Sequence, residues 1–396
     1  MSEWKKVKLG ELYEVHNGLS KGRQFFGSGY PFLTFSTVFN NWFLPKELDS
    51  LVQSSEKERE ACSIKKGDVF ITRTSETMDE LGMSSVALRD YPNATYNGFT
   101  KRLRPITDDV IPEYIGYYLR SPKFRGKFMA FSTMTTRASL ANGDLLGMEV
   151  ELPNKNEQHR IATILSRYDS LIENYQKQIK LLEEAAQRLY KEWFVDLHFP
   201  GHENTKIVDG VPEGWEKKRL SDIANIIMGQ SPKSEFYNTE GDGIPFHQGV
   251  GSYGYRFVVD NVYSTSFTRI AEPNSILFSV RAPVGRLNIT KNKIVIGRGL
   301  ASINHKMGCQ SYLYYLLKEK FFKDNIIGNG AIFASISKDE LYNLVFFIPS
   351  DEMVKRYDAI ANKIDKSIQY VDSQIRLLTE ARDRLLPKLM SGEIAV

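Results

Sequence analysis

The stretch QIKLLEEAAQRL (178–189) returns near the end of the chain as QIRLLTEARDRL (374–385). Eight of the twelve positions are identical, and the starting positions 374 and 178 differ by 196 residues. Such a repeat indicates that either a single helix or a larger unit is present twice. Which of the two holds decides the fold.

Both stretches lie inside heptad patterns, in 154–197 and in 350–396. Apolar side chains recur there in alternating steps of four and three residues, which is typical of a coiled-coil seam. We expect two helices of roughly 40 residues, each about 60 Å long at 1.5 Å per residue. Neither stripe is expected to persist exposed to water, so we expect the helices to pair as an antiparallel coiled coil. The seam includes Ile172, Ile179, Leu182, Leu189, Ile368, Ile375, Leu378 and Leu385, and only Arg382, at the place of Ala186, breaks it.

The repeat extends upstream of each helix. Trp4, Leu9 and Gly18 are matched at an offset of 211 by Trp215, Leu220 and Gly229. The turn GSGYPF (27–32) matches GDGIPF (241–246) at 214, Tyr117-Tyr118-Leu119 matches Tyr314-Tyr315-Leu316 at 197, and Ser139 matches Ser335 at 196. Order is kept while the offset drifts, as insertions and deletions in loops would produce. The duplicated unit is therefore a globular region followed by a long helix.

Short β-branched and aromatic runs, bounded by Gly, Pro and Asn, predict strands in both globular regions. They include DVFITRT (68–74), SILFSV (275–280) and KIVIG (293–297). We expect an α+β protein with two α/β domains in tandem, at 1–153 and 215–349. The Gly- and Pro-containing segment 198–214 is expected to be a linker.

Composition narrows the class of protein. The 396 residues predict two to four domains, and 42% hydrophobic and 25% charged residues are typical of a soluble globular protein. No apolar run is long enough to cross a bilayer, and Cys62 and Cys309 have no nearby cysteine partner. A reducing cytoplasm fits these observations. The formal charge of +4 comes mainly from 212–349, with 16 Lys and Arg against 12 Asp and Glu.

Motifs for catalysis are weak. Phe25-x-Gly27-x-Gly29 resembles the glycine loop of methyltransferases, but its repeat at 241–246 keeps the glycines and loses the first Phe. A repeated structural turn is the better interpretation. No Asp/Asn-Pro-Pro-aromatic tetrapeptide, P-loop or nucleophile elbow occurs in the sequence. Pro200 and Gly201 separate His198 from His202, so we expect no metal site. Because the catalytic motifs are missing, we expect no catalytic residue either.

Polar and basic side chains among aromatics remain as candidates for binding nucleic acid. Arg and Lys reach guanine edges or phosphates, and Gln can bracket adenine. In the first half the candidates are Lys21, Arg23, Arg73, Thr74, Lys101, Arg102 and Arg137. In the second half they are Lys233, Gln248, Arg256, Arg281, Arg286 and Arg298.

The whole organisation resembles that of specificity subunits of Type I restriction-modification systems. The resemblance rests on the helical repeat from Glu157, on the linker FPGHENTKIVDGVPEGW, and on GQSPKSEFYN (229–238), GIPFHQG (243–249) and LFSVRAPVG (277–285). The first half keeps this frame more loosely, with ITRTSETMDELGMSSVAL (71–88) where the second has LFSVRAPVGRLNI.

The resemblance implies a non-catalytic chain with two target-recognition domains, each reading one half of a split site in double-stranded DNA. The helices would set the gap, and the helix repeats that carry the eight seam residues would dock two modification subunits, which methylate adenine using S-adenosylmethionine. Restriction subunits would use ATP and magnesium, so this chain itself would need no cofactor.

Two alternatives stay open on the sequence. One is a methyltransferase or nuclease with fused specificity domains, and the other is a coiled-coil scaffold with two adaptor domains. Binding of S-adenosylmethionine by the chain alone would favour the first alternative. Absence of sequence-dependent duplex binding would favour the second.

Overall fold

The computed structural model describes residues 4–75, 80–131, 138–139, 141–322 and 335–396. It divides into two compact units, 1–175 with 374–396 and 176–373. Each unit holds one globular domain and one part of each of two long helices, α7 (Lys155–Phe194) and α11 (Asp351–Ser391).

The first unit is built on a four-stranded antiparallel sheet in the order β2-β9-β5-β7. A second sheet has the order β4-β3-β8, and β1 pairs with β11. The strands are β1 (Lys5–Lys8), β2 (Tyr13–Asn17), β3 (Phe26–Leu33), β4 (Leu51–Val52), β5 (Val69–Thr72), β6 (Thr74–Ser75), β7 (Ser84–Val86), β8 (Thr95–Tyr96), β9 (Thr100–Pro105), β10 (Ala138–Ser139) and β11 (Glu149–Leu152). The short helices are α1 (Leu9–Leu12), α2 (Phe35–Asn40), α3 (Glu56–Ala61), α4 (Pro112–Arg120), α5 (Pro122–Phe131) and α6 (Asn142–Gly147).

The second unit repeats this frame. Its main sheet has the order β15-β23-β20-β21, a five-stranded sheet runs β16-β18-β17-β22-β19, and β14 pairs with β24. The strands are β12 (Ile207–Val208), β13 (Val211–Pro212), β14 (Glu216–Arg219), β15 (Ala224–Met228), β16 (Tyr237–Asn238), β17 (Ile244–His247), β18 (Tyr263–Ser264), β19 (Ile270–Ala271), β20 (Ile276–Ser279), β21 (Leu287–Ile289), β22 (Ile294–Ile296), β23 (Leu300–His305) and β24 (Val345–Ile348). The helices are α8 (Leu220–Ile223), α9 (Gln310–Phe322) and α10 (Lys338–Tyr342).

The repeated glycine turn has the same geometry in both units. Gly27 and Gly29 have φ of 96° and 102°, and Gly241 and Gly243 have φ of 92° and 88°. A side chain on Gly29 or Gly243 would collide with the backbone of the neighbouring strand, β4 or β18. Glycine is required here for local backbone reasons, which supports the structural interpretation of this turn.

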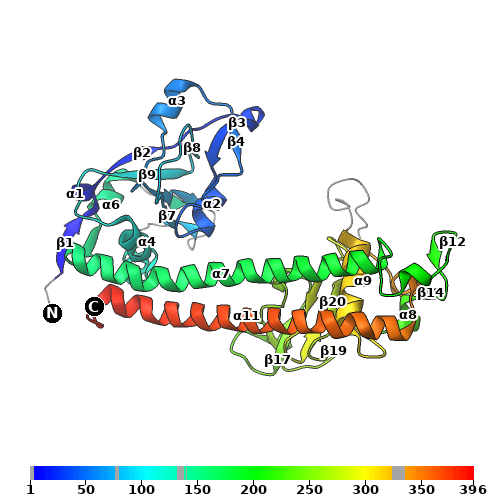
Figure 1. Ribbon diagram of the computed structural model, residues 1–396. Helices are drawn as coiled ribbons and strands as arrows, with labels where there is room; N and C mark the ends of the chain where they lie inside the picture. Colours follow the sequence, from blue (N-terminus) through cyan, green and yellow to red (C-terminus); the bar gives the residue numbers. More distant parts are fainter. Residues whose placement is uncertain (1–3, 76–79, 132–137, 140, 323–334) are drawn as a thin grey trace. The chain divides into compact units, whose positions relative to one another are not determined.

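The predicted helices are confirmed, with 40 residues in α7 and 41 in α11. In each unit the two helices lie side by side and antiparallel (Figure 1). In the first unit Arg160 bonds to Val396, which follows the end of α11, and Asp169 bonds to Arg382 within it, so numbers rise along α7 as they fall along α11. In the second unit the hydroxyl of Tyr357 donates to the carbonyl of Ala186.

All eight seam residues named above are buried or half-buried. The heptad pattern therefore identified the covered faces of both helices correctly. Among the described residues, no helix is both long and apolar enough to cross a membrane.

Candidate nucleic-acid interface

The same ends of matching strands carry polar side chains in both units. The backbone amide of Arg73 donates to the carbonyl of Phe99, and that of Val280 donates to the carbonyl of Gly299. Thr74 pairs with Ser139 across β6 and β10, just as Arg281 forms a β-bridge with Ser335. These bonds make Arg73 equivalent to Val280, and Thr74 equivalent to Arg281.

In the first unit this end of the sheet holds Arg73 and Lys101. Arg73 is half-buried, and its Nη1 donates to Asn17 Oδ1 at 3.3 Å. Lys101 is only 5% exposed, and its ammonium donates to Asn142 Oδ1. Burial, with a smaller contribution from the Arg73 charge, lowers the pKa of Lys101. A DNA contact by Lys101 stays a prediction, and it requires the bond to Asn142 to open.

In the second unit the corresponding end is open and basic. Arg281 and Arg298 are exposed and line a surface hollow of about 470 Å³ together with Lys338 and Met228. At this end of the sheet Gln248 is exposed too. The hydroxyl of Ser231 donates to Gln248 Oε1 at 2.8 Å and accepts from the backbone amide of Arg298 at 3.2 Å. Gln248, Arg281 and Arg298 therefore belong to one surface.

A second matched feature is a short turn before the second sheet of each unit, η1 (Arg23–Phe25) before β3 and η4 (Ser234–Phe236) before β16. Phe25 and Phe236 close these turns through equivalent backbone bonds, and both rings are exposed. Arg23 is exposed on the first turn, and Lys233 is exposed at the start of the second. An exposed cation beside an exposed ring suits contact with a nucleotide backbone and bases.

Lys21 is more constrained than its neighbour Arg23. Its ammonium lies 2.8 Å from Glu58 Oε2 and 5.0 Å from the centre of the Phe25 ring. The hydrogen bond from Lys21 and the bonds from Ser55 lower the pKa of Glu58 to about 2. Contact of Lys21 with a phosphate would compete with this ion pair.

Two candidate arginines lie inside the protein, and their interpretation as DNA contacts is wrong. Arg102 is 2% exposed and donates to the carbonyl of Ser63 at 2.7 Å. Arg256 is also 2% exposed and is paired with two carboxylates on the long helices. Of the other candidates, Arg137 falls outside the described residues, and for Thr74 only the backbone is described.

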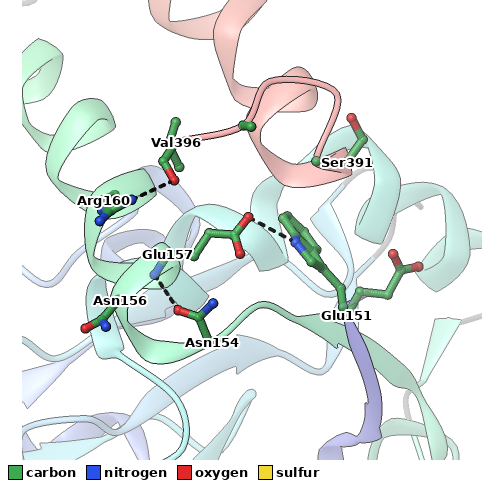
Figure 2. Close-up of a pocket in the computed structure, with 10 residues that line it drawn as sticks. Glu151, Asn154, Asn156, Glu157, Arg160, Ser391 and Val396 are labelled. Atoms are coloured by element: carbon green, nitrogen blue, oxygen red, sulfur yellow. Dashed lines mark hydrogen bonds between the residues drawn. The ribbon is translucent and has the colours of Figure 1, made fainter. Parts of the chain in front are cut away.

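A surface hollow of about 530 Å³ lies beside the ends of the long helices in the first unit. Figure 2 shows Arg160 of α7 donating to the carbonyl oxygen of Val396, with Glu157 nearby. The indole of Trp4 donates to Glu157 Oε1 at 3.2 Å. None of the DNA candidates lines this hollow. Across the described residues, no group of three or more His, Cys, Asp and Glu is placed to hold a metal ion.

The profile of one protein family, the Type I restriction modification DNA specificity domain, matches residues 1–184 and 212–385. The chain belongs to this family. It carries two specificity domains in tandem, each continuing into a long helix.

Named relatives extend over the whole chain. A putative type I restriction enzyme MjaX specificity subunit from Methanocaldococcus jannaschii is 30% identical over 100% of this chain and 94% of its own length. The HindI specificity subunit of Haemophilus influenzae is 24% identical over 100% of both chains. A solved Type-I restriction-modification S subunit from M. genitalium has a TM-score of 0.57, with 17% identity over 98% of this chain and 96% of its own. That structure shows likeness of fold.

Sequence reasoning missed part of the basic surface of the second specificity domain. Lys338 begins α10 and lines the same hollow as Arg281, but its sequence context carries no signal of this. Ser231 was missed as well, although its hydroxyl joins Gln248 to the backbone of Arg298. The lining of the hollow reveals Lys338, and the hydrogen bonds of its hydroxyl reveal Ser231.

Proposed function

We propose that this chain is the DNA-specificity subunit of a Type I restriction-modification complex, in which each domain reads one half of a bipartite DNA site. The observation that carries this proposal is the pair of matched strand ends. Their backbone bonds are the same, but their side chains differ: Thr74 stands where the second domain has Arg281. A shared scaffold with different polar groups is what two readers of different half-sites require.

The helices would set the spacing between the half-sites and dock two modification subunits. The eight seam residues are covered within this chain, so a partner would meet the outer faces of α7 and α11 instead. Large apolar side chains are exposed on these helices at Leu171, Leu181, Ile360, Tyr370 and Leu377. Exposed apolar groups of this size favour contact with another protein.

The chain would act without catalysis of its own, in the cytoplasm. S-adenosylmethionine would be used by the modification subunits, and ATP and magnesium by the restriction subunits. The sequence supports this division because it lacks the methyltransferase tetrapeptide and the P-loop.

Methylation mapping tests the proposal. Genomic DNA from cells with the modification subunits of this system should carry adenine methylation at one split motif only when this chain is present. Replacing 1–153 with the equivalent region of a relative should change one half of the motif and leave the other intact. Methyl transfer by the purified chain alone, or a change in both halves, would contradict the proposal.

A further inference from the structure

In each unit an aspartate on a long helix accepts a hydrogen bond from the hydroxyl of a tyrosine in the domain. Tyr117 Oη donates to Asp169 on α7, and Tyr315 Oη donates to Asp365 on α11. The two aspartates are equivalent in the repeat, because 365 and 169 differ by 196. Each aspartate also faces one arginine, and the origin of that arginine differs between the units.

In the first unit the arginine comes from the other helix. Arg382 of α11 lies 2.7 Å from Asp169, and its guanidinium lies 5.1 Å from the centre of the Trp42 ring. The Arg382 side chain is 15% exposed. Burial would lower the pKa of Arg382, but the bonds to Asp169 and Asp383 outweigh it and raise that pKa.

In the second unit the arginine comes from the domain. Arg256 lies 2.6 Å from Asp365 and 3.1 Å from Glu183 of α7, and it stacks 3.6 Å from the centre of the Tyr314 ring. Its side chain is 1% exposed. The helix position that corresponds to Arg382 is Ala186, which is buried and has no charge.

Trp42 and Arg256 occupy the same place in the two domains. The amide of Val86 donates to the carbonyl of Trp42, and the amide of Ile289 donates to the carbonyl of Arg256. Phe43, which follows Trp42, forms a parallel bridge to Val86, and Phe257, which follows Arg256, forms a parallel bridge to Ile289. The first unit therefore combines Trp42 in the domain with Arg382 on the helix. The second unit combines Arg256 in the domain with Ala186 on the helix.

We propose that this difference determines which helix pair a specificity domain can dock on. The carboxylates are partly buried, with 31% of the Asp169 side chain and 18% of the Asp365 side chain exposed, and removing the arginine leaves a partly desolvated charge without its partner. Two arginines at one partly buried carboxylate would repel each other, with less screening than at a fully exposed site. A domain with an aromatic residue at this place fits the pair bearing Arg382, whereas a domain with arginine fits the pair bearing Ala186. The partner recognised is therefore a specificity domain of matching chemistry.

One substitution measured in two backgrounds tests this proposal without DNA or partner subunits. The first background is the full chain. The second is a chimera in which a second copy of 215–349 replaces 1–153, so that a copy of Arg256 faces both Asp169 and Arg382. In the full chain Arg382→Ala should lower the melting temperature by about 2–4 °C, the shift expected for about 1 kcal/mol. In the chimera the same Arg382→Ala should raise it, because it removes the second arginine. A fall, or no change, in both backgrounds would overturn the proposal.

A second set of variants applies if the chimera does not fold. Trp42→Arg in the full chain should lower the melting temperature, and adding Arg382→Ala should restore part of the loss. Arg376 is an exposed arginine on the same helix, and Arg376→Ala serves as the matched control. Trp42→Arg with Arg376→Ala should be as unstable as Trp42→Arg alone. If Arg382→Ala and Arg376→Ala raised the melting temperature of the Trp42→Arg variant equally, the effect would come from the total charge of the protein. That result would overturn the proposal.

Discussion

At the scale of the residue, composition alone does not separate a DNA-binding arginine from a buried structural one. Arg256 and Arg281 are 25 positions apart in the same domain and carry the same charge. Arg256 is closed in by Glu183, Asp365 and an aromatic ring, whereas Arg281 is exposed at the end of a sheet. Arg256 differs because its carboxylate partners lie far away in the sequence, and Glu183, for example, is more than 70 residues from it. No local sequence pattern around Arg256 predicts such partners.

The exposed basic residues of the second domain should differ in the kind of DNA contact they make. In the complex with modification subunits, Arg281→Ala should cost about 1–3 kcal/mol of binding and relax the motif at one base pair. Lys233→Ala should instead weaken binding to all DNA sequences alike. It should also reduce the slope of the logarithm of the binding constant against the logarithm of the salt concentration by about one. Binding isotherms on duplexes with single base changes measure both effects. The matched control is Lys293, an exposed residue just before β22, at the end of that strand opposite to Gly297. Lys293→Ala should change neither the motif nor the salt slope.

At the scale of the element, local periodicity was enough to predict the helices but not the sheets. The heptad seam predicted two helices of about 40 residues, and even its break at Arg382 marks a real difference, an ion pair with Asp169. The runs 68–74, 275–280 and 293–297 contain β5, β20 and β22, as predicted. The order of strands could not be predicted, because β9 and β23 each lie between strands distant in sequence. Sequence identity aligns Tyr117 with Tyr314, at an offset of 197. The tyrosine that bonds to the equivalent aspartate is instead Tyr315, at an offset of 198, so identity alone does not fix the register.

The glycine turn gives a matched pair of substitutions within one element. Gly241 and Gly243 both have positive φ, but a side chain on Gly241 meets nothing within 4 Å, whereas one on Gly243 meets the backbone of Ser264 and Thr265. Gly241→Ala should cost about 1–2 kcal/mol from backbone strain alone. Gly243→Ala should cost more, about 3 kcal/mol or above, because β18 must also shift. Calorimetry of the second unit should show the larger fall in melting temperature for Gly243→Ala. Equal falls would show that the strand adjusts freely.

At the scale of the whole molecule, the duplication would let one chain serve the two half-sites and the two equivalent partners proposed above. Each unit has its own main sheet, glycine turn and aspartate–tyrosine bond, and each contains one stretch of both long helices. Two copies of one partner would require two equivalent docking surfaces, which a repeated helix could provide. Domain boundaries at 153 and 215 stay predictions, although α7 and α11 begin at Lys155 and Asp351, close to the expected 154 and 350.

The common length of the helices should then determine the spacing between half-sites. The boundary between the units falls after Tyr175 in α7 and before Gln374 in α11. One heptad inserted at each of these points keeps the seam in register, because seven residues restore the same face. It should lengthen the helix pair by about 10 Å at 1.5 Å per residue.

DNA rises 3.4 Å per base pair, so the gap in the methylated motif should grow by roughly three base pairs. The two half-words should stay the same, because no residue of either domain has changed. Three added base pairs also rotate one half-site by nearly a third of a turn, so methylation of the new motif should be slower than that of the parent. Methylation mapping with the lengthened chain measures the gap directly. A lengthened chain that methylates the original motif at the parental rate would show that the helices do not set the spacing.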